Sequence, residues 1–356
     1  MKVFLILAVL VGSIVLWNIA KPDSSPKLSK TTISPTVVLP SIIPQKTQKQ
    51  YLFVPYWSFG KTIDNNGFDS LIYFGVGVNN NGIELKDKGY ENLSAFVTKT
   101  QNAKERILAV RMVDKNINAD ILKNLKTQES IASAAVSLAT KNNFTGVLLD
   151  YETSALAFDS TTKNITSFYK LLSQKAHDNN LQFYVSLYGD TYFRARPFDI
   201  KQIGLISDKV LIMAYDFSKS SGNPGPDFPL ADNGTYGYSF SKMVDDFQKD
   251  VVNEKIVIIL GYFGYDWRVD NKEIALAAGI PLTTGEITKE FITKCSFKKC
   301  SLNRVQNTDE PSIRYIDESG ENHIVWFEDD VSIAKKKEFS KSKGILETAA
   351  WAYSYY

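Results

Sequence analysis

The chain alternates short, apolar, β-rich runs with amphipathic stretches from residue 51 to its end, and this order limits the folds open to it. Helical periodicity falls between most of the runs, over 129–141, 163–179, 239–249 and 331–343. The runs that read as strands are 51–57, 71–78, 106–112, 146–150, 182–187, 209–214, 255–261 and 346–352. Strands that alternate with helices indicate a parallel sheet with crossover helices. Eight such units in about 300 residues predict an α/β fold, the (β/α)8 or TIM barrel.

A doubly wound open sheet is the runner-up, but no glycine-rich phosphate loop follows the first strand. The connection between the seventh and eighth strands, about 265–328, is too long for a single helix. It contains a predicted short helix at 271–278 and a hairpin at 313–326 with turn residues at 317–320. We therefore expect an inserted α+β subdomain here, where insertions after barrel strands line the active-site rim.

The first 50 residues do not follow the barrel pattern. Residues 3–20 carry no charge, and a run of this length is long enough to span a bilayer. We predict an uncleaved membrane anchor over 1–20, with a cleaved signal sequence as the alternative. Residues 21–50 hold five prolines among many Ser, Thr and Lys residues, which is typical of an extended linker. Both interpretations place the domain at 51–356 outside the cytoplasm, either membrane-anchored or secreted.

Charge and cysteine content exclude several classes of partner. The 41 basic and 39 acidic residues give a net charge of +2. The sequence has no basic patch with interleaved aromatics, so it does not predict nucleic-acid binding. Two cysteines are too few for a structural zinc site. In an exported protein Cys295 and Cys300 are expected to form a disulfide, with two free thiols as the alternative. His177 and His323 lie far apart in the sequence and are interpreted as structural. We expect a monomer with no metal and no cofactor.

The run FTGVLLDYE at 144–152 is the strongest candidate for a catalytic segment. A buried strand carries no charge in its middle because desolvating a carboxylate is costly. Asp150 and Glu152 lie at the end of the fourth strand, two residues apart and on one face. In a barrel this end holds the active site. Glu152 is better placed as a proton donor, and the charge of the deeper Asp150 favours a protonated Glu152. Tyr151 is expected to pack in the wall. A strand that runs into a solvated acidic turn is the alternative.

Two other strand ends bring polar or aromatic side chains to the same mouth. Met213 and Tyr215 share a face at the end of the sixth strand, and Trp351 ends the eighth. A tyrosine hydroxyl beside two acids can orient a polar group of a substrate, and an indole face can support a sugar ring. Packing under a helix for Tyr215 and a core position for Trp351 are the alternatives.

These segments resemble glycoside hydrolase family 18, the chitinase-type barrels. The family's fourth-strand motif D-x-x-D-x-D-x-E occupies the frame of TGVLLDYE at 145–152, and its sixth-strand M-x-Y-D matches 213–216. Its eighth-strand tryptophan matches Trp351. The segments at 260–267 and 315–329 are most similar to the bacterial spore-cortex-lytic and germination-type N-acetylglucosaminidases. The resemblance covers residues 51–356.

The resemblance implies cleavage of β-1,4 bonds in polymers that contain N-acetylglucosamine, with peptidoglycan favoured and chitin-type oligomers second. It implies substrate-assisted retaining catalysis, an exception to the two-carboxylate scheme. Glu152 would protonate the glycosidic oxygen, and Asp150 would orient the substrate's acetamido group as that group attacks the anomeric carbon. Tyr215 would hydrogen-bond the same carbonyl. The expected substrate contacts are Trp351, Asp216, Met213, Tyr56, Trp57 and Trp267.

Two departures from the motif weaken the expected activity. Thr145 and Leu148 replace its first and second acids. Because Leu148 can neither donate nor accept a hydrogen bond, Asp150 is expected to lose a partner and to have a raised pKa. We therefore expect a slower enzyme or a shifted pH optimum. A carbohydrate-binding protein with a weak or inactive site on the same barrel is the alternative function.

Overall fold

The computed structural model describes residues 48–58, 60 and 62–356. The predicted anchor at 1–20 and the linker up to residue 47 lie outside the described residues. Within the described ranges, no helix has both the length and the apolar character that crossing a membrane requires.

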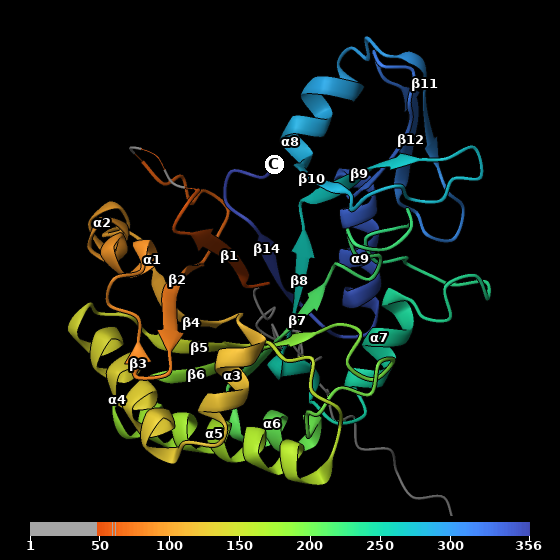
Figure 1. Cartoon of the computed structure of the whole chain (residues 1–356). Coiled ribbons are helices and arrows are strands. Elements are labelled where there is room, and N and C mark those ends of the chain that lie inside the picture. Colours follow the sequence, from red (N-terminus) through yellow and green to blue (C-terminus); the bar gives the residue numbers. More distant parts are fainter. Residues whose placement is uncertain (1–47, 59, 61) are drawn as a thin grey trace, which may run out of the picture. The chain divides into compact units, whose positions relative to one another are not determined.

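Eight parallel strands close into a barrel, as the sequence predicts (Figure 1). Their order is β1, β14, β8, β7, β6, β5, β4 and β2, and β1 also pairs with β2 in parallel, which closes the ring. That closing pair excludes the open doubly wound sheet. The barrel strands are β1 (Gln50–Pro55), β2 (Ser70–Asn79), β4 (Glu105–Met112), β5 (Gly146–Tyr151), β6 (Gln182–Tyr188), β7 (Lys209–Ala214), β8 (Ile256–Gly261) and β14 (Glu347–Trp351). A short strand, β3 (Gly82–Ile83), pairs antiparallel with β2.

Helices cover the outside of the barrel, so most strand residues are buried on both faces. The longest, α4 and α5, place their apolar sides on the sheet through residues such as Ile131 and Phe168. Inside the barrel, alternate strand residues form a second apolar cluster that includes Phe53, Leu148 and Ile259. The helices are α1 (Lys88–Glu91), α2 (Leu93–Lys99), α3 (Lys115–Ile121), α4 (Leu125–Lys141), α5 (Asp159–Asp178), α6 (Ile200–Ile206), α7 (Phe240–Phe247), the 3-10 turn η1 (Asn253–Lys255) and α9 (Asp330–Ser342).

An inserted subdomain separates β8 from β14, at the predicted position. It is built on a five-stranded antiparallel sheet in the order β10, β9, β13, β12, β11. Figure 1 shows it continuing from the carboxyl end of β8. Its elements are β9 (Phe263–Val269), β10 (Ile280–Thr283), α8 (Thr284–Ile287), the π-helical turn η2 (Thr288–Ile292), β11 (Lys298–Arg304), β12 (Pro311–Ile316) and β13 (Asn322–Phe327). Cys295, just before β11, forms a disulfide with Cys300, which lies within β11.

The helix predicted at 271–278 does not form. The Asp270 carboxylate accepts hydrogen bonds from the amides of Lys272 and Ile274, which turns the chain. Ala275 then pairs antiparallel with Val269 at the end of β9. The helical periodicity was misleading because tertiary pairing with the sheet outweighs a weak local preference.

Candidate active site

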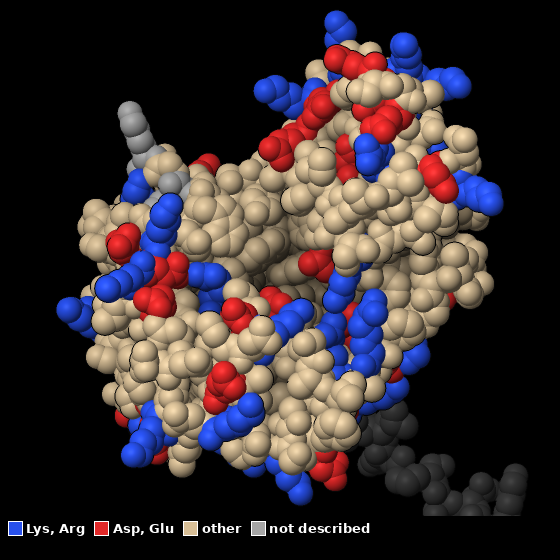
Figure 2. Space-filling model, in the orientation of Figure 1, with Lys and Arg blue, Asp and Glu red and all other residues tan. Residues whose placement is uncertain are grey.

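A cavity of about 630 Å³ opens at the carboxyl end of the barrel strands. This volume falls in the usual range for small-molecule sites, about 300–1,000 Å³. The ends of β5, β6 and β7 contribute polar groups, β14 contributes Trp351, and the inserted subdomain contributes Phe263, Tyr265 and residues 281–283 to the lining. In Figure 2 the hollow is seen in the centre of the molecule, with acidic and basic side chains on its wall. The barrel and the insertion together therefore form the cavity.

Asp150 lies deep in this cavity, at the end of β5, and is 4% exposed. Burial, and then the nearby Glu152, raise the pKa of Asp150 to about 7, although the Ser186 hydroxyl and Arg111 oppose the shift. Ser186 pairs in register with Asp150 on β6 and donates its hydroxyl hydrogen bond to Asp150 Oδ1. The expectation that Asp150 has no partner is therefore wrong, because the neighbouring strand supplies one.

Glu152 is the next side chain on the same face and is fixed by its neighbours. The Tyr188 hydroxyl donates to Glu152 Oε2 at 2.8 Å. The Asn118 side chain donates to the Glu152 carbonyl at 2.7 Å, and the Glu152 amide donates to the Met112 carbonyl at 2.8 Å. Sequence reasoning missed Ser186 and Tyr188. Their spacing of two residues at the end of a predicted strand was the available signal, because it places both on the face beside Asp150 and Glu152.

The structure explains the two motif positions that lack acids. Leu148 is fully buried in the apolar interior of the barrel, one layer below Asp150. Thr145 lies just before β5, at the end of the barrel away from the cavity, and its hydroxyl donates to the Arg106 carbonyl at 3.0 Å. Neither side chain lines the cavity.

Four other predicted residues line the cavity: Tyr215, Asp216, Met213 and Trp351. The rings of Tyr215 and Trp351 stack with their centroids 6.2 Å apart. Burial, and then Asp150 and Asp216, raise the pKa of Tyr215 well above its ordinary value, so its hydroxyl keeps its proton. Asp216 Oδ1 accepts a hydrogen bond from the Tyr265 hydroxyl at 2.6 Å.

The remaining predicted contacts lie beside or outside the cavity. Tyr56 and Trp57 pack edge to face, and Trp57 also packs against Phe74, which lines the cavity. Trp57 is 51% exposed, so both rings stay candidates for contact with a longer ligand. Trp267 is different: it is 1% exposed and its indole N–H donates to the Ser220 carbonyl at 3.0 Å. The prediction that Trp267 contacts substrate is wrong because the ring is enclosed in the insertion.

Basic side chains surround the acids in the cavity. Arg196 makes two hydrogen bonds with the buried Asp190, at 2.6 and 3.0 Å, and its guanidinium lies 3.7 Å from the centroid of the Tyr188 ring. It thereby holds the tyrosine that contacts Glu152. Lys115 and Lys219 also line the cavity, and neither side chain forms an ion pair with any residue in the described part of the chain. Partial burial, and then Arg196, lower the pKa of Lys219.

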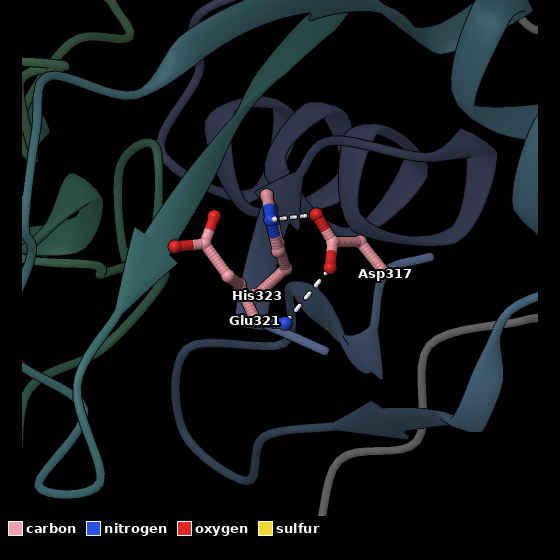
Figure 3. Close-up of side chains that lie close together, drawn as sticks. All are labelled: Asp317, Glu321 and His323. Carbon is pink, nitrogen blue, oxygen red and sulfur yellow. Dashed lines mark hydrogen bonds and ion pairs between the residues drawn. The ribbon is translucent and has the colours of Figure 1, made fainter. Parts of the chain in front are cut away.

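Among the described residues, one group of possible metal ligands occurs, in the insertion and outside the cavity lining (Figure 3). Asp317, Glu321 and His323 offer ligand atoms within 4.8 Å of one another. Glu321 already pairs with Arg268 at 3.0 Å, and Asp317 accepts the Glu321 amide at 2.8 Å. His323 Nδ1 lies 3.0 Å from Asp266, and its Nε2 lies 3.6 Å from Asp317. These partners explain the cluster as charge pairing, which agrees with a structural His323.

The model of the family described as glycosyl hydrolases family 18 matches residues 47–355 of this sequence. The chain belongs to this family. The match spans the barrel and the insertion together and includes Asp150 and Glu152.

Similar proteins fall among spore glycosylases and chitinases. The putative sporulation-specific glycosylase YdhD of Bacillus subtilis is 22% identical over 65% of this chain. The matched region spans only 52% of the length of that relative. The class V chitinase of Arabidopsis thaliana is 24% identical over 73% of each chain. The solved structure of the Bacillus cereus spore cortex-lytic enzyme SleL has a TM-score of 0.69 at 18% identity, covering 88% of this chain and 73% of that one. At such identities the structures share the fold.

The buried Asp150 makes stability depend on pH. Its pKa is raised in the folded state, so the stability it contributes is fully present below pH 4 and is lost as the pH rises through about 7. Asp150→Asn mimics the neutral acid at every pH. Relative to wild type, this variant should therefore gain about 2–4 kcal/mol of unfolding free energy between pH 4 and pH 8.5.

Urea unfolding of both proteins at the two pH values measures this difference. Asp120→Asn changes an exposed acid on α3 and is the control that should show no such gain. A difference between Asp150→Asn and wild type that stays constant with pH would contradict the assigned pKa.

Proposed function

We propose that this chain hydrolyses β-1,4 bonds next to N-acetylglucosamine in cell-wall polymers, by substrate-assisted retaining catalysis. The observation that carries the proposal is the pair Asp150, near the end of β5, and Glu152, just after it, which both line the cavity. In family 18, to which the chain belongs, enzymes act on polysaccharides that contain N-acetylglucosamine.

The roles of the two acids follow from their surroundings. Glu152 receives the Tyr188 hydrogen bond on Oε2, which leaves Oε1 to carry the proton given to the glycosidic oxygen. The acetamido oxygen of the substrate then attacks the anomeric carbon, and the leaving sugar departs with that proton. Water afterwards attacks the anomeric carbon and displaces the acetamido oxygen from it, while Glu152, acting as the base, takes a proton from the water.

Asp150 and Tyr215 act on the acetamido group. As the acetamido oxygen bonds to carbon, its nitrogen develops positive charge. An ionised Asp150 stabilises that charge, and the neutral Tyr215 hydroxyl donates a hydrogen bond to the acetamido carbonyl oxygen. Burial raises the pKa of Asp150 to about 7, so the ionised form becomes dominant only above neutral pH in the free protein. Ser186 holds the carboxyl group in the required orientation.

Two lysines in the cavity lining favour peptidoglycan as the substrate. Lys115 and Lys219 both line the cavity and add positive charge at its rim. Peptidoglycan carries carboxylates on its peptides, and on lactyl groups that bear no peptide, whereas chitin is uncharged. Anionic substituents next to the cleaved bond would therefore meet complementary charge.

An extracytoplasmic location is part of the proposal. The disulfide between Cys295 and Cys300 supports it, because such bonds persist in oxidising compartments. Attachment to a membrane through residues 1–20, or secretion, would bring the barrel to the wall polymer.

Substitution Glu152→Gln tests the proposed activity. It removes the transferable proton and keeps the shape, so turnover of N-acetylglucosamine oligomers and of purified peptidoglycan should fall by about 10²–10⁴-fold while sugar binding remains. Glu91→Gln, at an exposed acid of α1, is the matched control and should behave as wild type. Released sugar ends report the turnover.

If wild type and Glu152→Gln give equal, background-level signals while both bind the sugar, the chain is a carbohydrate-binding protein and the enzyme proposal fails.

Substitution of both Lys115 and Lys219 by Ala tests the substrate preference. The loss of two rim charges should lower kcat/KM on peptidoglycan by about 5–20-fold at low salt, with a smaller loss at high salt. Turnover of uncharged oligomers should stay within about twofold of wild type by the same argument. Lys123→Ala, a lysine paired with Asp120 on α3, is the control. Equal losses on both substrates would argue against recognition of carboxylates.

A further inference from the structure

A buried lysine joins the inserted subdomain to the barrel behind the active site. Lys336 lies on α9 and is fully buried. Its ammonium group donates to Glu310 Oε1 at 2.8 Å and to Glu328 Oε1. Glu310 immediately precedes β12, and Glu328 immediately follows β13, so both acids come from the insertion. A charge buried so completely is tolerated only when it is paired and hydrogen-bonded.

Glu310 continues the network toward the cavity. Its carboxylate accepts the amide of Asp227 at 2.5 Å and the amide of Phe228 at 2.9 Å. Asp227 in turn accepts the amide of Asp216 on Oδ1 at 2.8 Å, and its carbonyl accepts the amide of Phe217 at 2.7 Å. An unbroken series of hydrogen bonds therefore runs from Lys336 to the residue that follows Tyr215.

Asp216 needs such support because of its backbone. Its φ is +57°, in the left-handed region that costs a residue with a Cβ atom about 1 kcal/mol or more. This conformation directs the chain out of β7 just after Tyr215 and places Asp216 in the cavity lining. Tyr265 of β9 holds the Asp216 carboxylate from the other side. Asp216 is thus fixed at its amide and its carboxylate.

The charges in this network favour one protonation pattern. Glu310 and Glu328 contact Lys336, and Asp227 lies close to both of these acids and to Asp216. Burial, and then the neighbouring acids, raise the pKa of Asp227 well above its ordinary value. Burial, and then Glu310, raise the pKa of Glu328 to about 8. Burial and the neighbouring acids therefore favour the neutral forms of Asp227 and Glu328 at neutral pH.

We propose that Lys336 is a positioning residue for the active site, acting through Glu310 and Asp227 to hold Asp216 and the adjoining Tyr215 at the cavity. Only the expected kinetic effect of this role rests on the proposed function. The structural part, that the network fixes the backbone at Asp216 and Phe217, stands on the hydrogen bonds alone. The inserted subdomain then sets the geometry of groups on the barrel, besides lining the cavity.

The first test is hydrogen exchange in the full chain, which does not depend on turnover. Lys336→Met should speed exchange of the Asp216 and Phe217 amides by at least about tenfold, while the amides of β5 keep their protection. Lys335→Met is the matched control, because Lys335 is the preceding residue on α9 and pairs with Asp309 outside the network. It should leave exchange unchanged. Equal protection at 216 and 217 in wild type and Lys336→Met would overturn the proposal.

The second test separates positioning from general destabilisation. Lys336→Met should lower kcat/KM on N-acetylglucosamine oligomers by at least about tenfold in wild type, but by less than about twofold when Asp227 is already changed to Ala. A merely structural role would give the same factor in both backgrounds, and that result would overturn the proposal. If wild type itself shows no turnover, the proposed function fails, and the exchange measurement still decides the network.

Two variants of Asp227 decide the matter if Lys336→Met does not fold. Asp227→Asn keeps the Oδ1 acceptor for the Asp216 amide and the neutral charge, so its kcat/KM should stay within about threefold of wild type. Asp227→Ala removes the acceptor and should show the fast exchange and low turnover expected of Lys336→Met. An Asp227→Ala protein with wild-type exchange at Asp216 would contradict the proposal.

Discussion

The hydrogen bond from Ser186 to Asp150 is the interaction on which the active site depends. Asp150 is buried above an apolar layer that includes Leu148, where an unpartnered carboxylate would be costly. Ser186, in register on β6, donates a hydrogen bond to this carboxyl, while Arg111, in register on β4, pairs with Asp87. The hydroxyl holds the carboxyl in place whether it is neutral or ionised. A neutral partner also leaves the pKa of Asp150 high, because it adds no positive charge.

The barrel and the insertion contribute different things to the site. The closed sheet fixes the spacing of Asp150, Glu152, Ser186 and Tyr188, since adjacent parallel strands hold their side chains in register. The insertion supports the cavity mouth by two sets of hydrogen bonds. Tyr265 donates to the Asp216 side chain, and Glu310 accepts from the backbone amides of the loop that follows β7. Chemistry placed on rigid strands and supported by a second layer of hydrogen bonds is the arrangement that precise catalysis requires.

Much of the fold could be predicted because strands buried on both faces have a clear sequence pattern. The eight barrel strands, the four long helices and the place of the insertion were predicted from that pattern. The segment at 271–278 was not, because its contacts with β9 and with the Asp270 side chain outweigh helical propensity. Long-range pairing of this kind leaves no mark in a local sequence window.

The candidate site was predictable to the extent that its residues lie at strand ends. Asp150, Glu152, Tyr215 and Trp351 all line one cavity. Trp267 was misplaced because strand β9 belongs to the insertion, where burial of a large ring in a small core outweighs access to the cavity. Lys336 could not have been found, since it lies in a run of three lysines on α9 that resembles an ordinary solvated helix face.

The titration of Asp150 tests the burial-controlled active site most directly. Carboxyl carbon chemical shifts of 13C-labelled aspartate, followed from pH 4 to pH 9 and assigned by the missing signal in Asp150→Asn, report its ionisation. This carboxyl is expected to titrate near pH 7, and its pKa is expected to change when Ser186 is changed to Ala. An Asp150 signal that is fully ionised by pH 5 would contradict the burial-controlled site described above.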